Sequence, residues 1–331
     1  MFKTLSTIAT LLALVVVVVG AYVRLEHAGL GCPDWPGCYG QVSPLHASAD
    51  IAQAVAQQGS TAGPVSMQKA WYEMVHRYLA GTLGVLILLL AVLSWAGKFK
   101  IKQQSQPKIL PSVLLLTVIM QAALGMWTVT LLLKPVIVTL HLIGGMTTLA
   151  LLAWLTIQQY SLSALGRRAQ PLRGWALFGL VLLAIQISLG GWVSTNYAAL
   201  ICADLPTCQG QWLPVMDFKH GFQLIRELGQ TAEGEILSYQ ALTAIHWTHR
   251  VGAMVVALFW VGWLLAAFRV QALRVWSIIV GAALLTQLGV GIGNIISHLN
   301  LTVAVAHNAA AALLLMVVVM LNFALSIRST Y

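Results

Sequence analysis

The sequence predicts an all-α polytopic membrane protein, with eight transmembrane helices arranged as two pseudo-symmetric four-helix bundles. Three observations lead to this fold class. Of the 331 residues, 59% are hydrophobic and 8% are charged, and the mean hydropathy is +0.84, which excludes a soluble globular domain. Apolar runs of about 20 residues, enough to cross ~30 Å of hydrocarbon, recur along the chain. The two halves of the chain also repeat each other.

Eight apolar runs separated by polar residues are expected to be the membrane spans. The first run opens with Lys3 and is followed by Tyr22, Val23 and Arg24 rather than by a small-residue cleavage site, so we expect a retained helix. The eight runs cover residues 5–23, 71–95, 109–130, 135–157, 175–196, 242–268, 275–296 and 301–327.

Charged residues divide the loops into two sets. All nine acidic residues lie in one set or at its membrane edge, together with two long loops, 24–70 and 197–241, that hold the four cysteines. The net charge of +9 is read as membrane topology rather than nucleic-acid binding. The other set of loops, which includes both termini, is expected to be cytoplasmic because it carries most of the basic residues. These basic residues are Lys3, Lys98, Lys100, Lys102, Lys108, Arg167, Arg168, Arg173, Arg269, Arg274 and Arg328.

The chain contains an internal repeat. Residues 20–41 align without gaps on 190–211, and residues 73–77 match 246–250. Because each half has an even number of spans, the repeat is parallel, with an N-terminal half at 1–160 and a C-terminal half at 161–331. Further matches, 166 residues apart, pair Gln121 with Gln287, Gly125 with Gly291 and His141 with His307.

Four histidines lie early in the second, fourth, sixth and eighth spans: His76, His141, His249 and His307. Each is expected on the order of 10 Å below the outer surface. Two helices of one half can therefore bring two imidazoles to one depth, the arrangement by which a four-helix bundle holds a heme. The alternatives are buried histidines hydrogen-bonded to a neighbouring helix, and zinc, for which no carboxylate or thiolate lies at a matching depth.

Arg77 and Arg250 directly follow two of these histidines. Heme propionates are anionic and bind such donors, whereas the alternative is an interfacial arginine that snorkels to water. Small residues after the histidines either make space for a ring or allow close helix packing. They are Gly81, Gly84, Gly144, Gly145 and residues 309–312.

The two halves differ three residues before the first histidine of each pair. Glu73 stands before His76, and His246 stands before His249. Because positions i and i+3 share a helix face, Glu73 could act as a base or stabilise positive charge beside a macrocycle. The alternative is an interfacial glutamate that starts a helix and favours its positive end.

The four cysteines form two Cys-x5-Cys pairs, Cys32 with Cys38 and Cys202 with Cys208. Prolines between the cysteines suit closed loops, so a disulfide in each loop is the first interpretation, either structural or redox-active. Metal binding is the weaker alternative, because the spacing is not that of a zinc knuckle.

Taken together, these motifs resemble the heme A synthase family over nearly the whole chain. The resemblance is carried by Gly-Leu-Gly-Cys-Pro-Asp-Trp-Pro-Gly-Cys-Tyr-Gly from Gly29, by Glu73-x-x-His76-Arg77, and by the later histidines on eight spans. It implies an oxidoreductase that converts a ring methyl of heme O through hydroxylated intermediates to the formyl group of heme A, for cytochrome c oxidase assembly.

The resemblance also implies roles for individual residues. His249 and His307 would ligate the iron of a heme b cofactor in the C-terminal half. His76 and His141 would hold the iron of the substrate heme O in the N-terminal half, with Glu73 as the catalytic residue. Cys32 and Cys38 match the family's first-loop pair, while Cys202 and Cys208 match a more variable second pair. The resemblance gives no role to His246.

Two other functions each account for part of this pattern. A diheme b-type membrane electron carrier explains the histidines but not Glu73. An outer-face thiol–quinone oxidoreductase explains the cysteines but leaves the four histidines idle. Expected partners are a heme O synthase as heme donor, cytochrome c oxidase assembly factors, membrane lipid and an unidentified electron acceptor, with no nucleic acid. A homo-oligomer is left open. The two oxidised loops fit a bacterial inner membrane, with the cysteines on its outer face.

Overall fold

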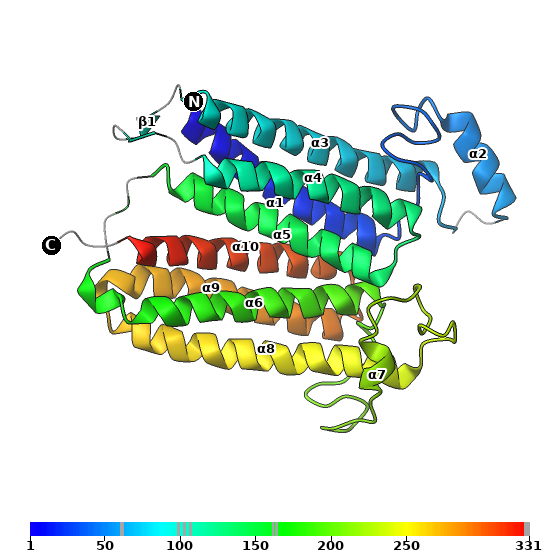
Figure 1. The fold of residues 1–331 in the computed structure, drawn as a ribbon. Coiled ribbons are helices and arrows are strands. Elements are labelled where there is room, and N and C mark those ends of the chain that lie inside the picture. Colours follow the sequence, from blue (N-terminus) through cyan, green and yellow to red (C-terminus); the bar gives the residue numbers. More distant parts are fainter. Residues whose placement is uncertain are drawn as a thin grey trace. The chain divides into compact units, whose positions relative to one another are not determined.

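A computed structural model describes residues 1–59, 63–97, 100–101, 104–105, 108–160, 162 and 165–327. Within these ranges, eight helices are long and apolar enough to cross a membrane (Figure 1). The eight predicted spans are confirmed, with ends that differ by a few residues. The helices are α1 (Phe2–Leu25), α3 (Met67–Trp95), α4 (Ile109–Thr130), α5 (Pro135–Ile157), α6 (Leu172–Thr195), α8 (Tyr239–Phe268), α9 (Arg274–Ile296) and α10 (Leu301–Ser326).

Short elements lie in the connections between the long helices. They leave the predicted fold class unchanged, since the strands form only a two-residue antiparallel ladder between α3 and α4. Lys98, Lys102 and Arg328, assigned to the cytoplasmic set, lie outside the described residues. The short elements are α2 (Ser48–Gln57), β1 (Lys100–Ile101), β2 (Gln104–Ser105), the 3-10 turns η1 (Arg167–Ala169) and η2 (Gln271–Leu273), and α7 (Phe218–Gly221).

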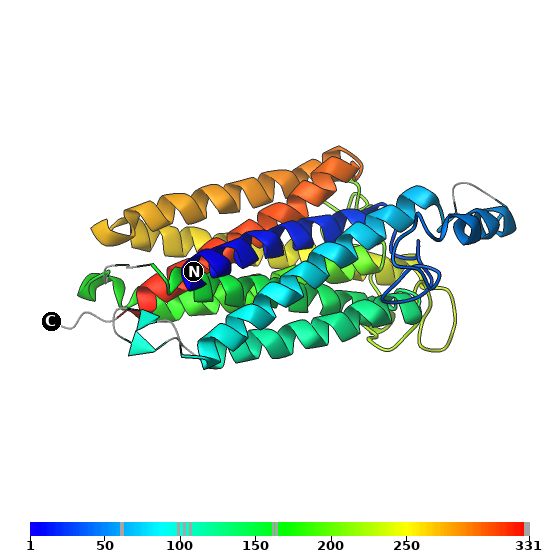
Figure 2. The ribbon, with the colours of Figure 1, turned by 90° about the horizontal axis from the view of Figure 1, so that it is seen from above.

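The chain divides into two compact units, Met1–Thr148 and Leu149–Tyr331. In the first unit, α3 packs against α1 and α4; in the second, α6 packs against α8 and α10, and α9 packs against α10 (Figure 2). The boundary falls inside α5. The last turns of α5 belong to the second unit, where the Trp154 ring meets Phe323 edge-on at 5.3 Å.

The helix that follows each long loop starts earlier than its predicted apolar run. Ser66 caps α3 by accepting the Lys69 amide at 3.1 Å, and Ser238 caps α8 by accepting the Ala241 amide at 3.2 Å. A capping serine satisfies a helix amide that would otherwise lack a partner. Each helix therefore extends beyond the bilayer-length stretch, and its first turns rise toward the cysteine loop.

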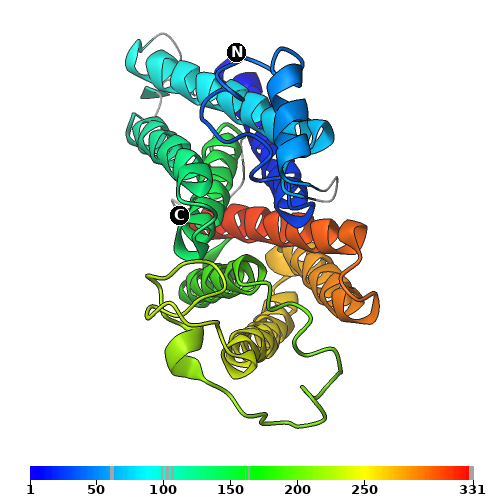
Figure 3. The ribbon, with the colours of Figure 1, turned by 90° about the vertical axis from the view of Figure 1, so that its right-hand side faces the viewer.

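In the first unit, a small apolar cluster joins the first cysteine loop to the start of α3. Ile51 of α2 is 2% exposed and packs with Met74 and the two loop cysteines. Figure 3 looks onto this end of the unit, where α2 and the loop cover the helix ends. The cluster fixes the loop against the outer turns of α3.

In the second unit, α7 and the segment that follows it contact the C-terminal end of α6, where the second cysteine loop begins. Trp192 of α6 donates from its indole to the carbonyl of Gly221, 2.9 Å away. The buried Arg226 guanidinium donates to Asn196 and lies over the Trp192 ring. Burial lowers the pKa of Arg226 from its ordinary value.

The internal repeat extends to the backbone. Four pairs of equivalent residues, none of them glycine, adopt the left-handed conformation, with φ between 50° and 63°. Such residues are uncommon because Cβ crowds the backbone there, so their recurrence at equivalent positions supports the parallel repeat. The pairs are His27 with Tyr197, Tyr39 with Gln209, Leu132 with His298 and Leu133 with Leu299.

Candidate functional site

The four candidate histidines lie in the second or the third turn of their helices. His76 of α3 and His249 of α8 lie in the third turn of their helices, and His141 of α5 and His307 of α10 lie in the second turn. All four are half-buried. Within each unit the two imidazoles lie close enough to interact electrostatically, His76 with His141 and His249 with His307. The structure therefore places the two imidazoles of each predicted pair in one unit, within electrostatic range of each other.

Each imidazole packs against a glycine of the preceding long helix. A Cβ atom added to Gly20 would lie 2.8 Å from Cε1 of His76, which is closer than such contacts occur. The imidazole thus fills the space that a side chain would take. The other three pairs, with the corresponding distances, are Gly125 with His141 (3.3 Å), Gly190 with His249 (3.0 Å) and Gly291 with His307 (3.0 Å).

The small residues that follow the histidines serve two purposes. Cβ atoms added to Gly81, Gly84 or Gly145 would meet nothing within 4 Å, so these glycines leave open space rather than a close helix contact. Gly144 differs, because an added Cβ would collide with the side chain of Gln121 on α4. Of the two alternatives, close packing therefore applies to Gly144.

Glu73 is buried at the outer part of α3, with 4% of its surface exposed. Its Oε2 accepts the backbone N–H of Cys32 at 3.0 Å, and its Oε1 pairs with Arg77 one turn later. Because α3 begins at Met67, Glu73 lies beyond the first turn. The alternative of an interfacial glutamate that starts the helix and favours its positive end does not match this position. The carboxylate is held from the cysteine loop on one side and from α3 on the other.

Arg77 fastens the first cysteine loop to α3. Its Nη1 donates to the carbonyls of Asp34 at 2.8 Å and Pro36 at 3.3 Å, and also to that of Gly37. Sequence reasoning expected a propionate donor and did not foresee these carbonyl contacts. The signal was available only in three dimensions, since 40 or more residues separate the partners.

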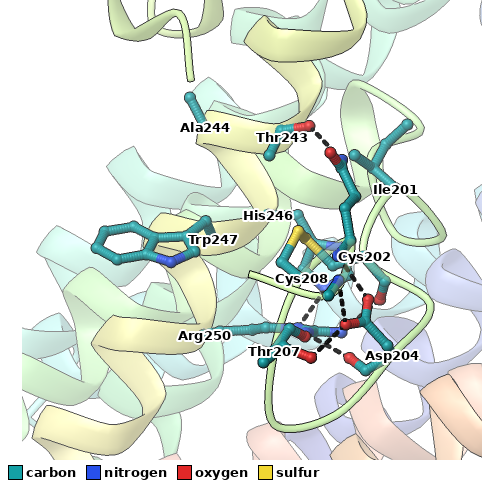
Figure 4. The surroundings of a disulfide bond; sticks show 12 residues. Ile201, Cys202, Asp204, Thr207, Cys208, Thr243, Ala244, His246, Trp247 and Arg250 are labelled. Atoms are coloured by element: carbon teal, nitrogen blue, oxygen red, sulfur yellow. Dashed lines mark hydrogen bonds between the residues drawn. A yellow bond between two sulfur atoms is a disulfide. The ribbon is translucent and has the colours of Figure 1, made fainter. Parts of the chain in front are cut away.

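The second unit repeats this clamp with a different neighbour (Figure 4). Arg250 donates to the carbonyls of Asp204 and Thr207, each at 2.8 Å, and to that of Cys202. Its Nε also donates to Nε2 of His246, 3.3 Å away. His246 thus takes the place that Glu73 has in the first unit, which gives the residue a structural role that the sequence did not supply.

Both cysteine loops are closed by the predicted disulfides. The Cα atoms of Cys32 and Cys38 are 4.8 Å apart, and those of Cys202 and Cys208 are 4.6 Å apart. Inside the second loop, the Thr207 hydroxyl donates to the Asp204 carboxylate at 2.5 Å. This bond and the amide N–H groups of Gly210 and Gln209 hold the pKa of Asp204 well below its usual range.

The full-length pattern of the chain matches one protein family. The family model described as cytochrome oxidase assembly protein, COX15-CtaA, aligns with residues 3–319. The chain belongs to the COX15-CtaA family.

Curated relatives of this COX15-CtaA protein carry the name heme A synthase. The protein from Shewanella oneidensis is 39% identical over 331 residues, which cover 98% of this chain and 97% of the relative. The protein from Shouchella clausii is 27% identical over 74% of this chain and 75% of its own length. The protein from Halalkalibacterium halodurans is 24% identical over 94% of this chain and 93% of its own length.

Two cavities lie along α8 in the second unit of this COX15-CtaA protein. One, of about 270 Å³, lies between α6 and α8 and is lined by Gln186, Gly252 and apolar side chains. The other, of about 210 Å³, lies between α8 and the second disulfide loop, with Cys208, Trp247 and Arg250 in its wall. Figure 4 shows the Trp247 ring directed away from the disulfide.

Proposed function

We propose that this protein is a heme A synthase, which oxidises a ring methyl of heme O through hydroxylated intermediates to the formyl group of heme A for cytochrome c oxidase. One observation carries the proposal. Two equivalent imidazole pairs are present, and among the residues that the structure describes only one of them has a buried carboxylate, Glu73, one turn away. The name that the relatives from three bacteria share supports the same reaction.

The described residues fit two hemes. Heme iron takes two axial imidazoles, and each unit contains two half-buried imidazoles in mutual electrostatic range. Nδ1 of His76 and of His307 is buried without a hydrogen-bond partner among the described residues, as expected for rings whose surroundings are incomplete. His249 and His307 would hold heme b, and His76 and His141 would hold heme O.

The two hemes would have different tasks. Heme b, when bound, supplies a one-electron redox centre that carries electrons away from the substrate. The chain's own residues would orient the substrate by its axial ligands and exclude water through the apolar helices. Arg77 and Arg250, whose guanidiniums are fixed beside the cysteine loops, are the donors that we assign to the propionates.

Glu73 is the residue that we assign to the chemistry. When water supplies the oxygen, conversion of the methyl C–H to C–OH releases two protons and two electrons. The electrons would leave through heme b to the electron acceptor, and a carboxylate within reach of the methyl group can accept a proton. The Cys32 amide and Arg77 hold the carboxylate in one position. His246 at the equivalent place in the second unit brings no negative charge, which suits a site that keeps its heme.

The membrane orientation and the partners follow from the same proposal. Both termini would be cytoplasmic, on the side of the basic loops that follow the second, fourth and sixth membrane helices. The disulfide loops would face the oxidising side of a bacterial inner membrane. A heme O synthase would donate the substrate. Cytochrome c oxidase assembly factors would receive the product.

The test is to purify the protein from a host that makes heme O, extract the hemes in acid solvent and separate them by chromatography with mass detection. Heme A and hydroxylated heme O beside heme b are the expected result. Heme b alone, at two per chain, would replace the proposal with a diheme electron carrier. Replacement of all four cysteines without loss of heme content would remove the thiol–quinone alternative.

A further inference from the structure

Three of the four imidazoles meet the amide of a glutamine on the preceding long helix. The Gln186 amide nitrogen lies 2.9 Å from Nδ1 of His249 and donates to the His249 carbonyl at 2.9 Å. Gln121, with its amide nitrogen turned toward α5, makes the same two contacts with His141, at 2.9 Å and 3.1 Å. Gln287 reaches Nε2 of His307 at 3.3 Å.

The glutamines occur at a fixed spacing from the glycines that the imidazoles touch. Gln121, Gln186 and Gln287 each precede such a glycine by four residues, which makes a Gln-x3-Gly motif on one helix face. A second glycine, three residues after the histidine, makes room for the amide in two cases. With the Gln121 nitrogen turned toward His141, a Cβ atom added to Gly144 would lie 1.5 Å from the Gln121 amide oxygen, and one added to Gly252 would lie 2.3 Å from the Gln186 amide oxygen.

The first helix departs from this motif. Val16 stands four residues before Gly20, where the other helices have glutamine, and Leu79 stands three residues after His76, where α5 and α8 have glycine. Nδ1 of His76 is buried and has no hydrogen-bond partner in the described part of the chain. His76 therefore keeps the glycine contact and lacks the amide.

An amide beside Nδ1 matters for a ligand imidazole. When Nε2 binds a metal, Nδ1 carries the proton, and an acceptor for that proton fixes the ring and makes it a stronger donor. A glutamine amide presents oxygen or nitrogen by a half-turn of its last bond. Such a half-turn supplies the acceptor at Nδ1 and gives up the donation of the amide nitrogen to the histidine carbonyl. Loss of such a partner typically weakens metal binding about 10–100-fold.

We propose that Gln121 and Gln186 are positioning residues that fix one imidazole in each unit, and that His76, without such an amide, is the exchangeable ligand of the substrate heme. This inference rests on the proposed function. A substrate site must release its heme after each conversion, whereas a cofactor site must retain it. In the first unit, His76 is the imidazole that no glutamine contacts in the described part of the chain, which meets the first need. In the second unit both imidazoles contact a glutamine, His249 at Nδ1 and His307 at Nε2, which meets the second.

The positioning role is tested at Gln186 by substitutions with opposite expected effects. Gln186→Leu removes the acceptor, and the heme b midpoint potential is expected to rise because the ligand donates less charge. Gln186→Glu provides a charged acceptor, and the potential is expected to fall below that of the unmodified protein. A role in packing alone would move both variants in one direction, and that result would overturn the proposal for Gln186.

The exchange role is tested by adding the missing motif. Val16→Gln with Leu79→Gly is expected to slow transfer of the substrate-site heme to apomyoglobin by about tenfold, and Val15→Gln, on an exposed face of α1, is the matched control. If the double variant retains no heme b, and so does not fold, Gln121→Leu is used instead and is expected to speed the transfer. An unchanged transfer rate in the variant that folds contradicts the proposal.

Heme ligation by His249 and positioning by Gln186 are tested separately. If His249→Ala retains the low-spin bis-imidazole spectrum, the proposed ligation itself is wrong. If His249→Ala loses this spectrum while both Gln186 variants leave the potential unchanged, the proposed function stands and the positioning role of the amide is wrong.

Discussion

Arg250 donates from Nε to Nε2 of His246, one turn earlier on α8, across 3.3 Å. In α3 the equivalent positions hold Arg77 and Glu73, which form an ion pair. Both arginines are held by carbonyls of a disulfide loop. The two units therefore keep the same clamp and differ in whether a carboxylate or an imidazole lies against it.

Glu73→Gln is expected to lower heme A formation by about 10²–10⁴-fold, because a positioned base contributes that much to proton transfer. The amide keeps the shape and can still accept the Cys32 N–H, so heme b content should be unchanged. Acid extraction and chromatography of the hemes measure both quantities. The matched control is His246→Gln, which should keep turnover; equal losses in the two variants would contradict the assignment of chemistry to one unit.

Gly190→Val is expected to reduce heme b binding by about tenfold or more. The added Cβ would lie 3.0 Å from Cε1 of His249, and overpacking of this kind costs about 1–3 kcal/mol. The heme b content per chain, from the pyridine hemochrome spectrum, measures the effect. Gly289→Ala on α9 is the control, since its Cβ would meet nothing within 4 Å. Retention of full heme b in Gly190→Val would show that the imidazole does not need this space.

The two disulfides are expected to affect different measurements. The first-loop variant Cys32→Ser/Cys38→Ser loosens the amide that donates to Glu73 at 3.0 Å, and should lower turnover by about tenfold, the value of a hydrogen bond to a charged group. The second-loop variant Cys202→Ser/Cys208→Ser loosens the loop that holds Arg250 and should alter the heme b potential instead.

For either disulfide, closing so short a loop stabilises the fold by about 2 kcal/mol in the chain-entropy model, so both variants should unfold at a lower temperature. Turnover, potential and the unfolding temperature are measured side by side. If the first-loop variant has a lower unfolding temperature but full turnover, the first disulfide does not affect turnover through Glu73.

Asp204 is expected to make stability depend on pH in acid. Its pKa is lower in the folded protein than its ordinary value, because the Thr207 hydroxyl and two amides donate to the carboxylate. The stabilisation is therefore complete above the ordinary pKa and is lost as the pH falls toward the folded value. Unfolding temperatures measured from pH 5 downward should fall less steeply in Asp204→Asn than in the parent protein. Asp50→Asn, on an exposed turn of α2, is the control and should follow the parent curve.

Sequence reasoning predicted the long helices well because the bilayer requires about 20 apolar residues, and such runs are visible in one dimension. It placed the starts of α3 and α8 too late, since their first turns carry polar side chains and depend on the Ser66 and Ser238 caps. Helix α2 was missed for a related reason. Its alanines and glutamines show no bilayer-length run, and it packs through Ile51 on a disulfide.

The site was predicted in part. The spacing of the histidines indicated which imidazoles would meet, because helix rise converts sequence position into depth. The partners of Arg77 and Arg250 were not predictable, since loop carbonyls have no sequence signature. The Gln-x3-Gly spacing of the glutamines is visible in the sequence. A repeat of residue types does not by itself reveal that an amide faces an imidazole ring.

The carbonyl clamp on Arg250 has a consequence for how an anionic group would bind beside it. A free arginine side chain carries about 2 kcal/mol of rotamer entropy, which is lost when a ligand immobilises it. Four hydrogen bonds already fix this guanidinium in the folded protein. Folding has removed that freedom beforehand, so an incoming acidic group meets a rigid cation and binds without that further loss of entropy.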